Sequence, residues 1–189
     1  MPEVRPQLYT VGHSTLSIEE FLSLLTGAGV KALVDVRRFP GSRRHPQFGA
    51  DALADSLRSV GIDYESFREE LGGRRSRKDV EGTSVTLPDN SAWRNSSFRA
   101  YADYMSTPAF ATGLERLEVL GRERPTAFMC AEAHPSRCHR RLIADTLLAR
   151  GWRVVHILSG GREQEHTFTP DAVVDGDRVH YPAQPSLDL

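Results

Sequence analysis

Two continuous runs of apolar residues constrain the fold of this chain more than any other feature. Residues 31–37 read KALVDVR, and residues 125–130 read PTAFMC. A strand that is apolar on both faces is typical of a parallel sheet with helices packed on both sides. The chain is therefore expected to build such a sheet.

Helical segments alternate with these strands. Ser17 and Glu20 form a capping box at the start of the first helix, Pro108 fits the first position of another, and Ser136 is predicted to cap a third. Strands are predicted over residues 8–12, 31–37, 62–66, 125–130 and 152–158, and helices from residue 17 and over 50–60, 98–105, 108–120 and 137–149. We predict an α/β fold with an open, mostly parallel, Rossmann-like sheet flanked by helices.

Two segments depart from this alternation. Residues 72–96 show little periodicity and are interpreted as an irregular insertion. A small hairpin with an Asp-Gly turn is predicted within residues 172–181. We therefore expect a single α/β domain over residues 1–158, followed by a C-terminal appendage and tail over residues 159–189.

Composition excludes several classes of protein. No run approaches the roughly 18 apolar residues of a transmembrane helix, and residues 1–6 lack the apolar run of a signal peptide. Two cysteines are too few for the disulfide framework of a small secreted domain. We expect a cytoplasmic protein with no membrane partner, and the sequence makes no prediction about its oligomeric state.

Basic residues are concentrated locally, although the formal net charge is only −1. Eleven of the 24 Lys and Arg residues lie within residues 37–44, 74–78 and 137–141. Lys and Arg bind the phosphate backbone of nucleic acids without regard to sequence. The distribution therefore leaves open a non-catalytic nucleic-acid-binding module.

Polar residues follow three of the predicted strands, at the edge of a parallel sheet where ligands bind. They are Gly12, His13 and Ser14 after the first strand, Asp35, Arg37 and Arg43 after the second, and Cys130, Glu132, Cys138, His139 and Arg140 after the fourth. Glycine permits close backbone contact, and the free N–H groups at a helix start favour an anion. The sequence predicts a phosphate-bearing substrate at this edge.

These residues divide by the chemistry of their side chains. Carboxylate, imidazole and thiol groups can move protons, orient partners or act as nucleophiles. The catalytic candidates are Glu132, His139, His13, Asp35 and Cys138. The substrate-binding candidates are Gly12, Ser14, Arg37, Arg43, Arg140 and Cys130. Our leading hypothesis is a metal-independent hydrolase or transferase, without a cofactor, acting on a nucleotide or nucleic acid; the same side chains could instead form ordinary salt bridges.

The Cys130–His139 loop has a further interpretation. Cys130, His134, Cys138 and His139 are all suitable ligands for zinc or iron, so a metal- or haem-binding protein stays open, although the spacing is not that of a known zinc motif. Six residues separate Cys130 from Arg137, one more than in the loop of cysteine phosphatases and rhodaneses. A proline in this loop also removes a backbone N–H, so that chemistry is not predicted.

Several motifs of the chain occur together, in the same order, in one known family. They are YTVGHS at 9–14, LVDVR at 33–37, PGSR at 40–43, LGG at 71–73, and the segment from CAE at 130–132 to CHR at 138–140. Over about residues 8–158 the chain closely resembles the bacterial and archaeal family called domain of unknown function 488. The resemblance implies a cytoplasmic α/β protein whose recurrent polar motifs are those at the strand ends, and it implies no activity.

Overall fold

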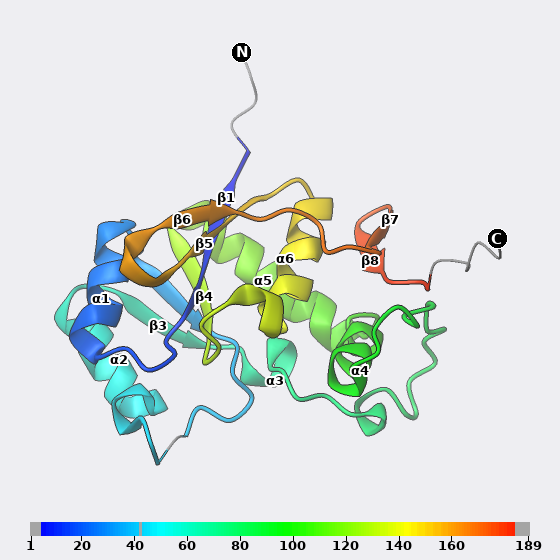
Figure 1. Ribbon diagram of the computed structural model, residues 1–189, viewed down its shortest axis with the longest axis horizontal. Helices are drawn as coiled ribbons and strands as arrows, with labels where there is room; N and C mark the ends of the chain where they lie inside the picture. The colour runs from blue at the N-terminus through cyan, green and yellow to red at the C-terminus, as the bar shows by residue number, and fades with distance from the viewer. Residues whose placement is uncertain (1–4, 42, 184–189) are drawn as a thin grey trace, which may run out of the picture.

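A six-stranded sheet forms the centre of the computed structural model, which describes residues 5–41 and 43–183 (Figure 1). Its strands are β1 (Gln7–Gly12), β2 (Ala32–Asp35), β3 (Asp63–Ser66), β4 (Thr126–Cys130), β5 (Arg153–Ile157) and β6 (Glu163–Glu165). They lie in the order β3-β2-β4-β1-β5-β6, and only β6 pairs antiparallel with its neighbour. Gly12 lies opposite Cys130, and Asp35 opposite Met129, so the carboxyl ends of β1, β2 and β4 meet.

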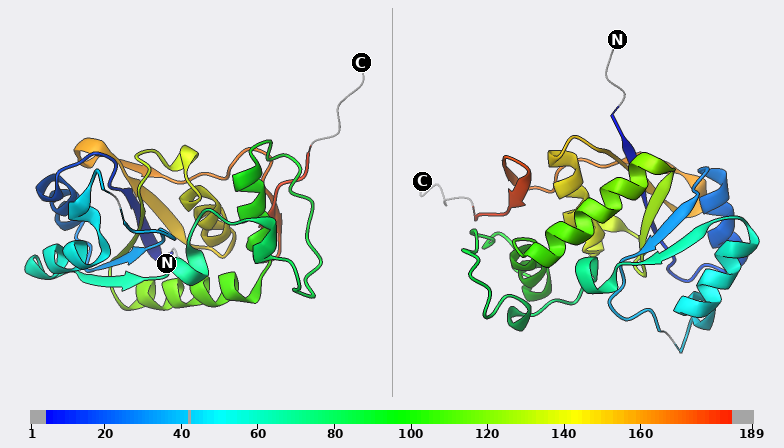
Figure 2. Two further views of the ribbon diagram at one scale, coloured as in Figure 1. Left: turned by 90° about the horizontal axis from the view of Figure 1, so that it is seen from below. Right: turned by 180° about the vertical axis from the view of Figure 1, so that it is seen from behind.

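Helices cover both faces of this sheet (Figure 2). They are α1 (Ile18–Gly27), α2 (Ala50–Ser59), α3 (Arg68–Leu71), α4 (Ser96–Tyr104), α5 (Pro108–Glu123) and α6 (Arg140–Ala149). Two apolar clusters result, one that includes α1 and α2 and another that includes α3 to α6. In β4, Ala127 and Met129 belong to the first cluster, whereas Phe128 and Cys130 belong to the second. Side chains of a strand alternate between faces, which explains why its sequence is apolar throughout.

The predicted fold class is confirmed. The sheet is open and mostly parallel, and β7 (Val173–Asp175) and β8 (Arg178–His180) form the small C-terminal hairpin. The edge strand β6 was not predicted. The predicted helix cap at Ser136 is wrong, because residues Pro135–Arg137 form a 3-10 turn and α6 begins at Arg140 after His139.

The two segments that depart from the alternation contact the rest of the molecule. Asn90, within the predicted insertion, donates to Asp103 of α4 and accepts from the backbone N–H of Tyr181. Of the predicted C-terminal appendage and tail over residues 159–189, residues 184–189 lie outside the described residues. None of the helices in the described ranges combines the length and the apolarity that a membrane span requires.

Candidate functional site

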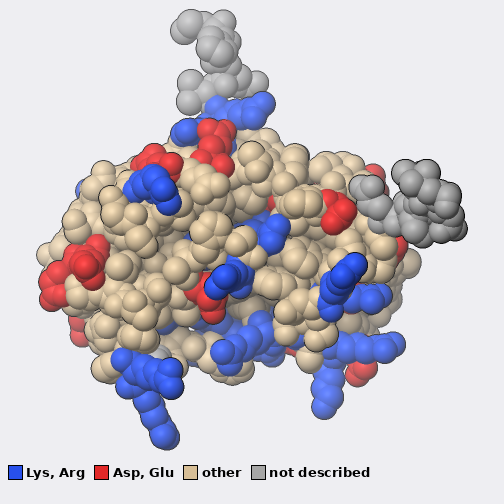
Figure 3. All heavy atoms as spheres, in the orientation of Figure 1, with Lys and Arg blue, Asp and Glu red and all other residues tan. Residues whose placement is uncertain are grey.

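A cavity of about 380 Å³ lies beside the carboxyl ends of β2 and β4. Its walls are contributed by residues within 37–41, 73–74, 95–101 and 130–139. This is the edge of the sheet at which α/β proteins bind ligands. On the face drawn in Figure 3, Lys and Arg side chains are most numerous in the lower half, the side on which the parallel strands end in Figure 1.

The cavity brings together about half of the predicted site residues. Those in its wall are Arg37, Cys130, Glu132, Cys138 and His139. Those that do not line it are Gly12, His13, Ser14, Asp35, Arg43 and Arg140. Several residues of the second group contact members of the first: Asp35 and His13 contact Arg37, and Arg140 donates to the carbonyl of Glu132. Arg43, in contrast, is exposed on the loop after β2.

Asp35 fixes the position of Arg37. The carboxylate is 1 % exposed, and it accepts from Arg37 Nε at 2.9 Å and from Nη2 at 2.6 Å. The hydroxyl of Tyr64 donates to the same carboxylate at 2.8 Å, and burial together with Asp35 raises the pKa of Tyr64 well above its usual value. A two-point Arg–carboxylate pair is directional, so the guanidinium is held rigidly at the cavity wall.

His13 contacts the other side of the same guanidinium. Its Nδ1 donates to the carbonyl of Ser14 at 2.9 Å, and its Nε2 lies 3.4 Å from Arg37 Nη1. The ring stacks on Phe48 with centroids 4.2 Å apart. Burial, and then the charge of Arg37, lower the pKa of His13 to about 4. The imidazole is therefore neutral at neutral pH and can accept from Arg37.

Cys130, Cys138 and His139 form a compact group, called here the Cys–Cys–His cluster. The Nδ1 of His139 lies 3.6 Å from Cys138 Sγ and 4.0 Å from Cys130 Sγ, and all three atoms lie within 4.8 Å of one another. On the other side of the ring, Nε2 lies 2.9 Å from the carbonyl oxygen of Val36. A carbonyl can only accept, so Nε2 carries the proton and the lone pair of Nδ1 faces the two thiols.

The two thiols of the cluster differ in acidity. The hydrogen bond to Cys138 and burial raise the pKa of Cys130 to about 12. Burial opposes ionisation of Cys138, but the bond from Cys130 and the charge and backbone N–H of Arg140 outweigh it and lower the pKa to about 7. Cys138 is the thiol that ionises near neutral pH.

Arg140 and Gly12 position the loop that follows β4. The Arg140 side chain is 1 % exposed, and it donates from Nη2 to the carbonyl of Glu132 at 2.7 Å and from Nη1 to Thr10 Oγ1 at 2.9 Å. A Cβ atom on Gly12 would lie 1.8 Å from that same Glu132 carbonyl oxygen. The close backbone contact predicted for Gly12 is thus made with the protein's own loop, and Arg140 faces this loop rather than the cavity.

A buried chain of hydrogen bonds continues from Thr10 across the sheet. Thr10 Oγ1 lies 2.7 Å from His156 Nδ1, and His156 Nε2 lies 2.9 Å from His166 Nδ1. His166 Nε2 bonds Asp145 at 2.8 Å, and Tyr181 donates to the other oxygen of that carboxylate at 2.8 Å. Burial, followed by the charges of His166 and Arg140, lowers the pKa of His156 to about 3. This series of hydrogen bonds connects the C-terminal segment, through His166 and Tyr181, to strands β1 and β5.

The cavity wall also contains residues that were not among the candidates, and three of them are Tyr101, Gly73 and Arg74. The buried ring of Tyr101 lies 4.9 Å from that of His139, and its hydroxyl donates to Leu71 O. A Cβ atom on Gly73 would lie 2.7 Å from His139 Nδ1. Arg74 lines the cavity with a φ of +54°, which is uncommon for arginine. The LGG motif at 71–73 and the basic segment at 74–78 were the signals that pointed to Gly73 and Arg74, whereas Tyr101 was expected only as part of a helix over residues 98–105.

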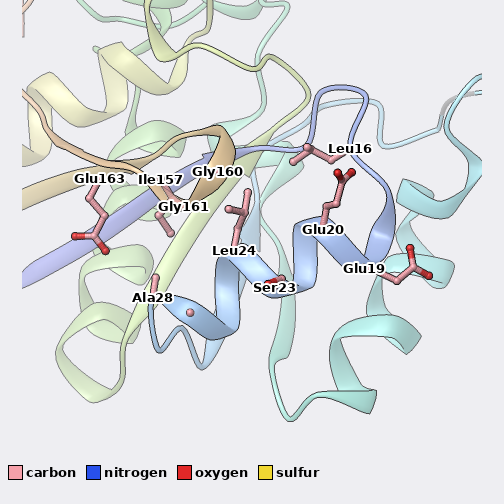
Figure 4. Close-up of a pocket in the computed structure, with 11 residues that line it drawn as sticks. Leu16, Glu19, Glu20, Ser23, Leu24, Ala28, Ile157, Gly160, Gly161 and Glu163 are labelled. Atoms are coloured by element: carbon pink, nitrogen blue, oxygen red, sulfur yellow. The ribbon is translucent and has the colours of Figure 1, made fainter.

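A second hollow, of about 630 Å³, lies between α1 and the turn that precedes β6 (Figure 4). Its charged side chains are Glu19, Glu20 and Glu163, and no thiol, imidazole or basic group is among the described residues that line it. Glu20 is already engaged, because its carboxylate accepts from the backbone N–H of Ser17 in the capping box at the start of α1. The cavity with the Cys–Cys–His cluster is therefore the candidate site.

Comparison with known protein families supports the resemblance drawn from the motifs. The family model described as Domain of unknown function DUF488 matches residues 17–147, more than half of the chain. The chain belongs to this family. The DUF488 match includes every residue of the cavity wall and excludes β1, with Gly12 to Ser14, and β5. No curated protein and no solved structure matches the chain.

Proposed function

We propose that the protein is an enzyme that acts on a phosphate-bearing substrate, a nucleotide or a nucleic acid, in the cavity beside β2 and β4. The observation that carries the proposal is a pair of arginines, Arg74 and Arg137, at the cavity wall. Neither side chain makes a hydrogen bond or an ion pair with another described residue. Arginine binds phosphate through two parallel N–H groups, so this pair can hold an anion at the open side of the cavity.

Two other arginines line the same cavity but are already paired. Arg37 is held by Asp35, and Arg38 donates to Asp79 at 2.9 Å. A positioned cation costs little additional ordering when the anion arrives, which favours tight and oriented binding. Arg37 and Arg38 are therefore fixed by their acidic partners, whereas the side chains of Arg74 and Arg137 can adjust to the bound anion.

Aromatic residues give the cavity a surface for a base. Phe39 is 65 % exposed, and the centroid of its ring lies 6.0 Å from Cζ of the Arg38 guanidinium. Phe98 belongs to the part of the cavity wall formed by residues within 95–101, and its ring stacks on that of Trp93 with centroids 4.9 Å apart. Stacking on an aromatic side chain contributes about 1–3 kcal/mol per base. Arginines with aromatic rings favour a nucleotide over a simple phosphate ester.

Glu132 is the only acidic side chain among the described residues of the cavity wall. It is exposed to the cavity and follows Cys130 by two residues, in a loop that Arg140 and Gly12 hold in place. A carboxylate beside a bound phosphate ester can take a proton from a water or a hydroxyl nucleophile. We assign Glu132 as the general base of a hydrolytic or transfer reaction.

Binding is tested by calorimetry with three probes: ADP, a single-stranded DNA oligonucleotide and inorganic phosphate. We expect the Arg74→Gln/Arg137→Gln double variant to bind ADP or the oligonucleotide at least tenfold more weakly, because each charged hydrogen bond contributes about 1.5–3 kcal/mol. Arg162→Gln is the matched control, since Arg162 is exposed and lies outside the cavity wall. Equal affinity in all three proteins would contradict the proposal.

Catalysis is tested separately with Glu132→Gln. This variant is expected to keep its affinity and to lose turnover by about 100-fold or more, the usual contribution of a general base. Retained turnover would remove Glu132 from the mechanism. A wild-type protein that binds the oligonucleotide and releases no product from any phosphate ester tested would instead be a nucleic-acid-binding module.

A further inference from the structure

We propose that Cys130, Cys138 and His139 bind one zinc ion, with the fourth coordination position open to the cavity. The proposal goes beyond the proposed function, which needs no metal, and rests on separate observations. Both cysteines are free thiols, Cys130 at the end of β4 and Cys138 two residues before the start of α6, and the chain returns on itself to bring them to the same imidazole.

The spacing of the three ligand atoms fits a single ion. Zinc binds thiolate sulfur at about 2.3 Å and imidazole nitrogen at about 2.0–2.1 Å, so tetrahedral geometry separates S and N by about 3.6 Å and two S atoms by about 3.8 Å. The observed distance from Nδ1 is 3.6 Å to Cys138 Sγ and 4.0 Å to Cys130 Sγ. The three atoms lie within 4.8 Å of one another, so small side-chain rotations close the site.

The imidazole is held in the tautomer that a metal requires. Nε2 of His139 donates to the carbonyl of Val36 at 2.9 Å, which leaves the lone pair of Nδ1 facing the thiols. A hydrogen bond from the second ring nitrogen to a carbonyl is the usual outer contact of a metal-bound histidine. Tyr101 on one side and the bare Cα of Gly73 on another restrict rotation of the ring.

The surroundings of the Cys–Cys–His cluster favour a zinc site with one open coordination position over a structural site with four protein ligands. All three residues line the cavity, and the fourth candidate from the sequence, His134, bonds Ser136 at 2.7 Å and is absent from the cluster. Three protein ligands and one free position are typical of zinc sites that bind water or substrate. Two thiolates also neutralise the charge of the ion, so Arg37 is not repelled.

A nucleophilic cysteine is the competing explanation of the same cluster. A Cys–His pair needs one thiol and one imidazole, and it gives no reason for the second thiol to converge on Nδ1. The backbone N–H of Arg140 also approaches Cys138 Sγ at 3.4 Å, a contact that stabilises a thiolate ligand as it would a nucleophile. The second sulfur is therefore the observation that favours zinc.

The test measures metal content in the full chain, purified without a histidine tag and with a phosphine reductant that does not bind zinc. Apoprotein is mixed with excess Zn²⁺, exchanged into metal-free buffer and analysed by mass spectrometry for zinc per chain. We expect about one zinc per chain in the wild type and in the control His134→Gln, and at least a tenfold loss in Cys130→Ser, Cys138→Ser and His139→Gln.

A second measurement requires no variant and so does not depend on how each variant folds. Co²⁺ added to the wild-type apoprotein should give thiolate-to-cobalt charge-transfer absorption and the visible bands of tetrahedral cobalt, and Zn²⁺ should abolish both. Wild-type protein that retains no zinc and gives no charge-transfer band would overturn the proposal, as would equal zinc content in all variants. Neither measurement contains a nucleotide, so failure of the proposed function would leave the zinc result unchanged.

Discussion

Replacing Gly12 by Ala is expected to displace the loop that follows β4. The added Cβ would lie 1.8 Å from the carbonyl oxygen of Glu132 and 2.7 Å from its carbonyl carbon. Real Cβ atoms essentially never approach closer than 3.0 Å, so the carbonyl must retreat by about 1.2 Å, the difference between 3.0 and 1.8. The obstacle is backbone, so a side-chain rotation cannot relieve it.

The displacement has two costs that can be estimated from the structure. Overpacking of a closely packed site destabilises by about 1–3 kcal/mol. The Arg140 guanidinium also loses its 2.7 Å bond to the carbonyl of Glu132, and a hydrogen bond to a charged group contributes about 1.5–3 kcal/mol. Because one movement causes both losses, we expect a combined decrease of about 3 kcal/mol in the free energy of unfolding, or about 6–12 °C in Tm.

Thermal unfolding and ADP binding together test this prediction. Gly27→Ala is the matched control, because Gly27 ends α1 with no atom within 4 Å of an added Cβ, and its Tm should stay equal or rise slightly. The Gly12 variant should also bind ADP more weakly, since Glu132 and the cavity wall move with the loop. If its Tm falls by less than about 2 °C, the loop can accommodate the methyl group and the reasoning is wrong.

Three further predictions concern buried polar groups. Asp35→Asn leaves the buried Arg37 guanidinium without its counter-charge and should lower the free energy of unfolding by about 3–5 kcal/mol in urea titrations; a change below about 1 kcal/mol would refute the assignment. His13 stays neutral in the folded protein to pH about 4, whereas the unfolded chain takes up a proton near its usual pKa of 6.5, so stability falls by up to about 3 kcal/mol between pH 6.5 and 4. His13→Gln should remove that part of the acid sensitivity, and identical pH profiles would contradict it. Tyr181→Phe removes the hydroxyl that bonds Asp145 and should cost about 1–3 kcal/mol, measured by urea denaturation.

The sequence predicted the sheet because burial leaves a direct mark on a strand. Residues 32–36 and 126–130 are mostly apolar, and the structure buries every residue of β2 and β4 and places these strands side by side in the sheet. The edge strand β6 has no such mark, since Glu163–Glu165 is exposed and its pairing with β5 depends on the path of the chain. The four-residue helix α3 is likewise too short to show a helical period.

The sequence could predict those features of the candidate site that follow from the order and direction of the strands. Parallel strands end at one edge, so Arg37 and Cys130 were expected near each other and do line one cavity. Spacing could not show that Arg140 turns toward the protein's own loop, because that depends on where the Glu132 carbonyl lies. It also could not place Tyr101, whose sequence context resembles that of any residue in a helix core.

The buried carboxylate of Asp145 depends on residues that follow the end of the family match. The family match ends at residue 147, yet the donors to Asp145 among the described residues come later: the ring of His166, the backbone N–H of Thr169 and the hydroxyl of Tyr181. An isolated buried charge costs several kcal/mol, comparable with the whole stability of many domains. Family members whose chains stop near residue 147 should therefore carry an uncharged residue at the position of Asp145.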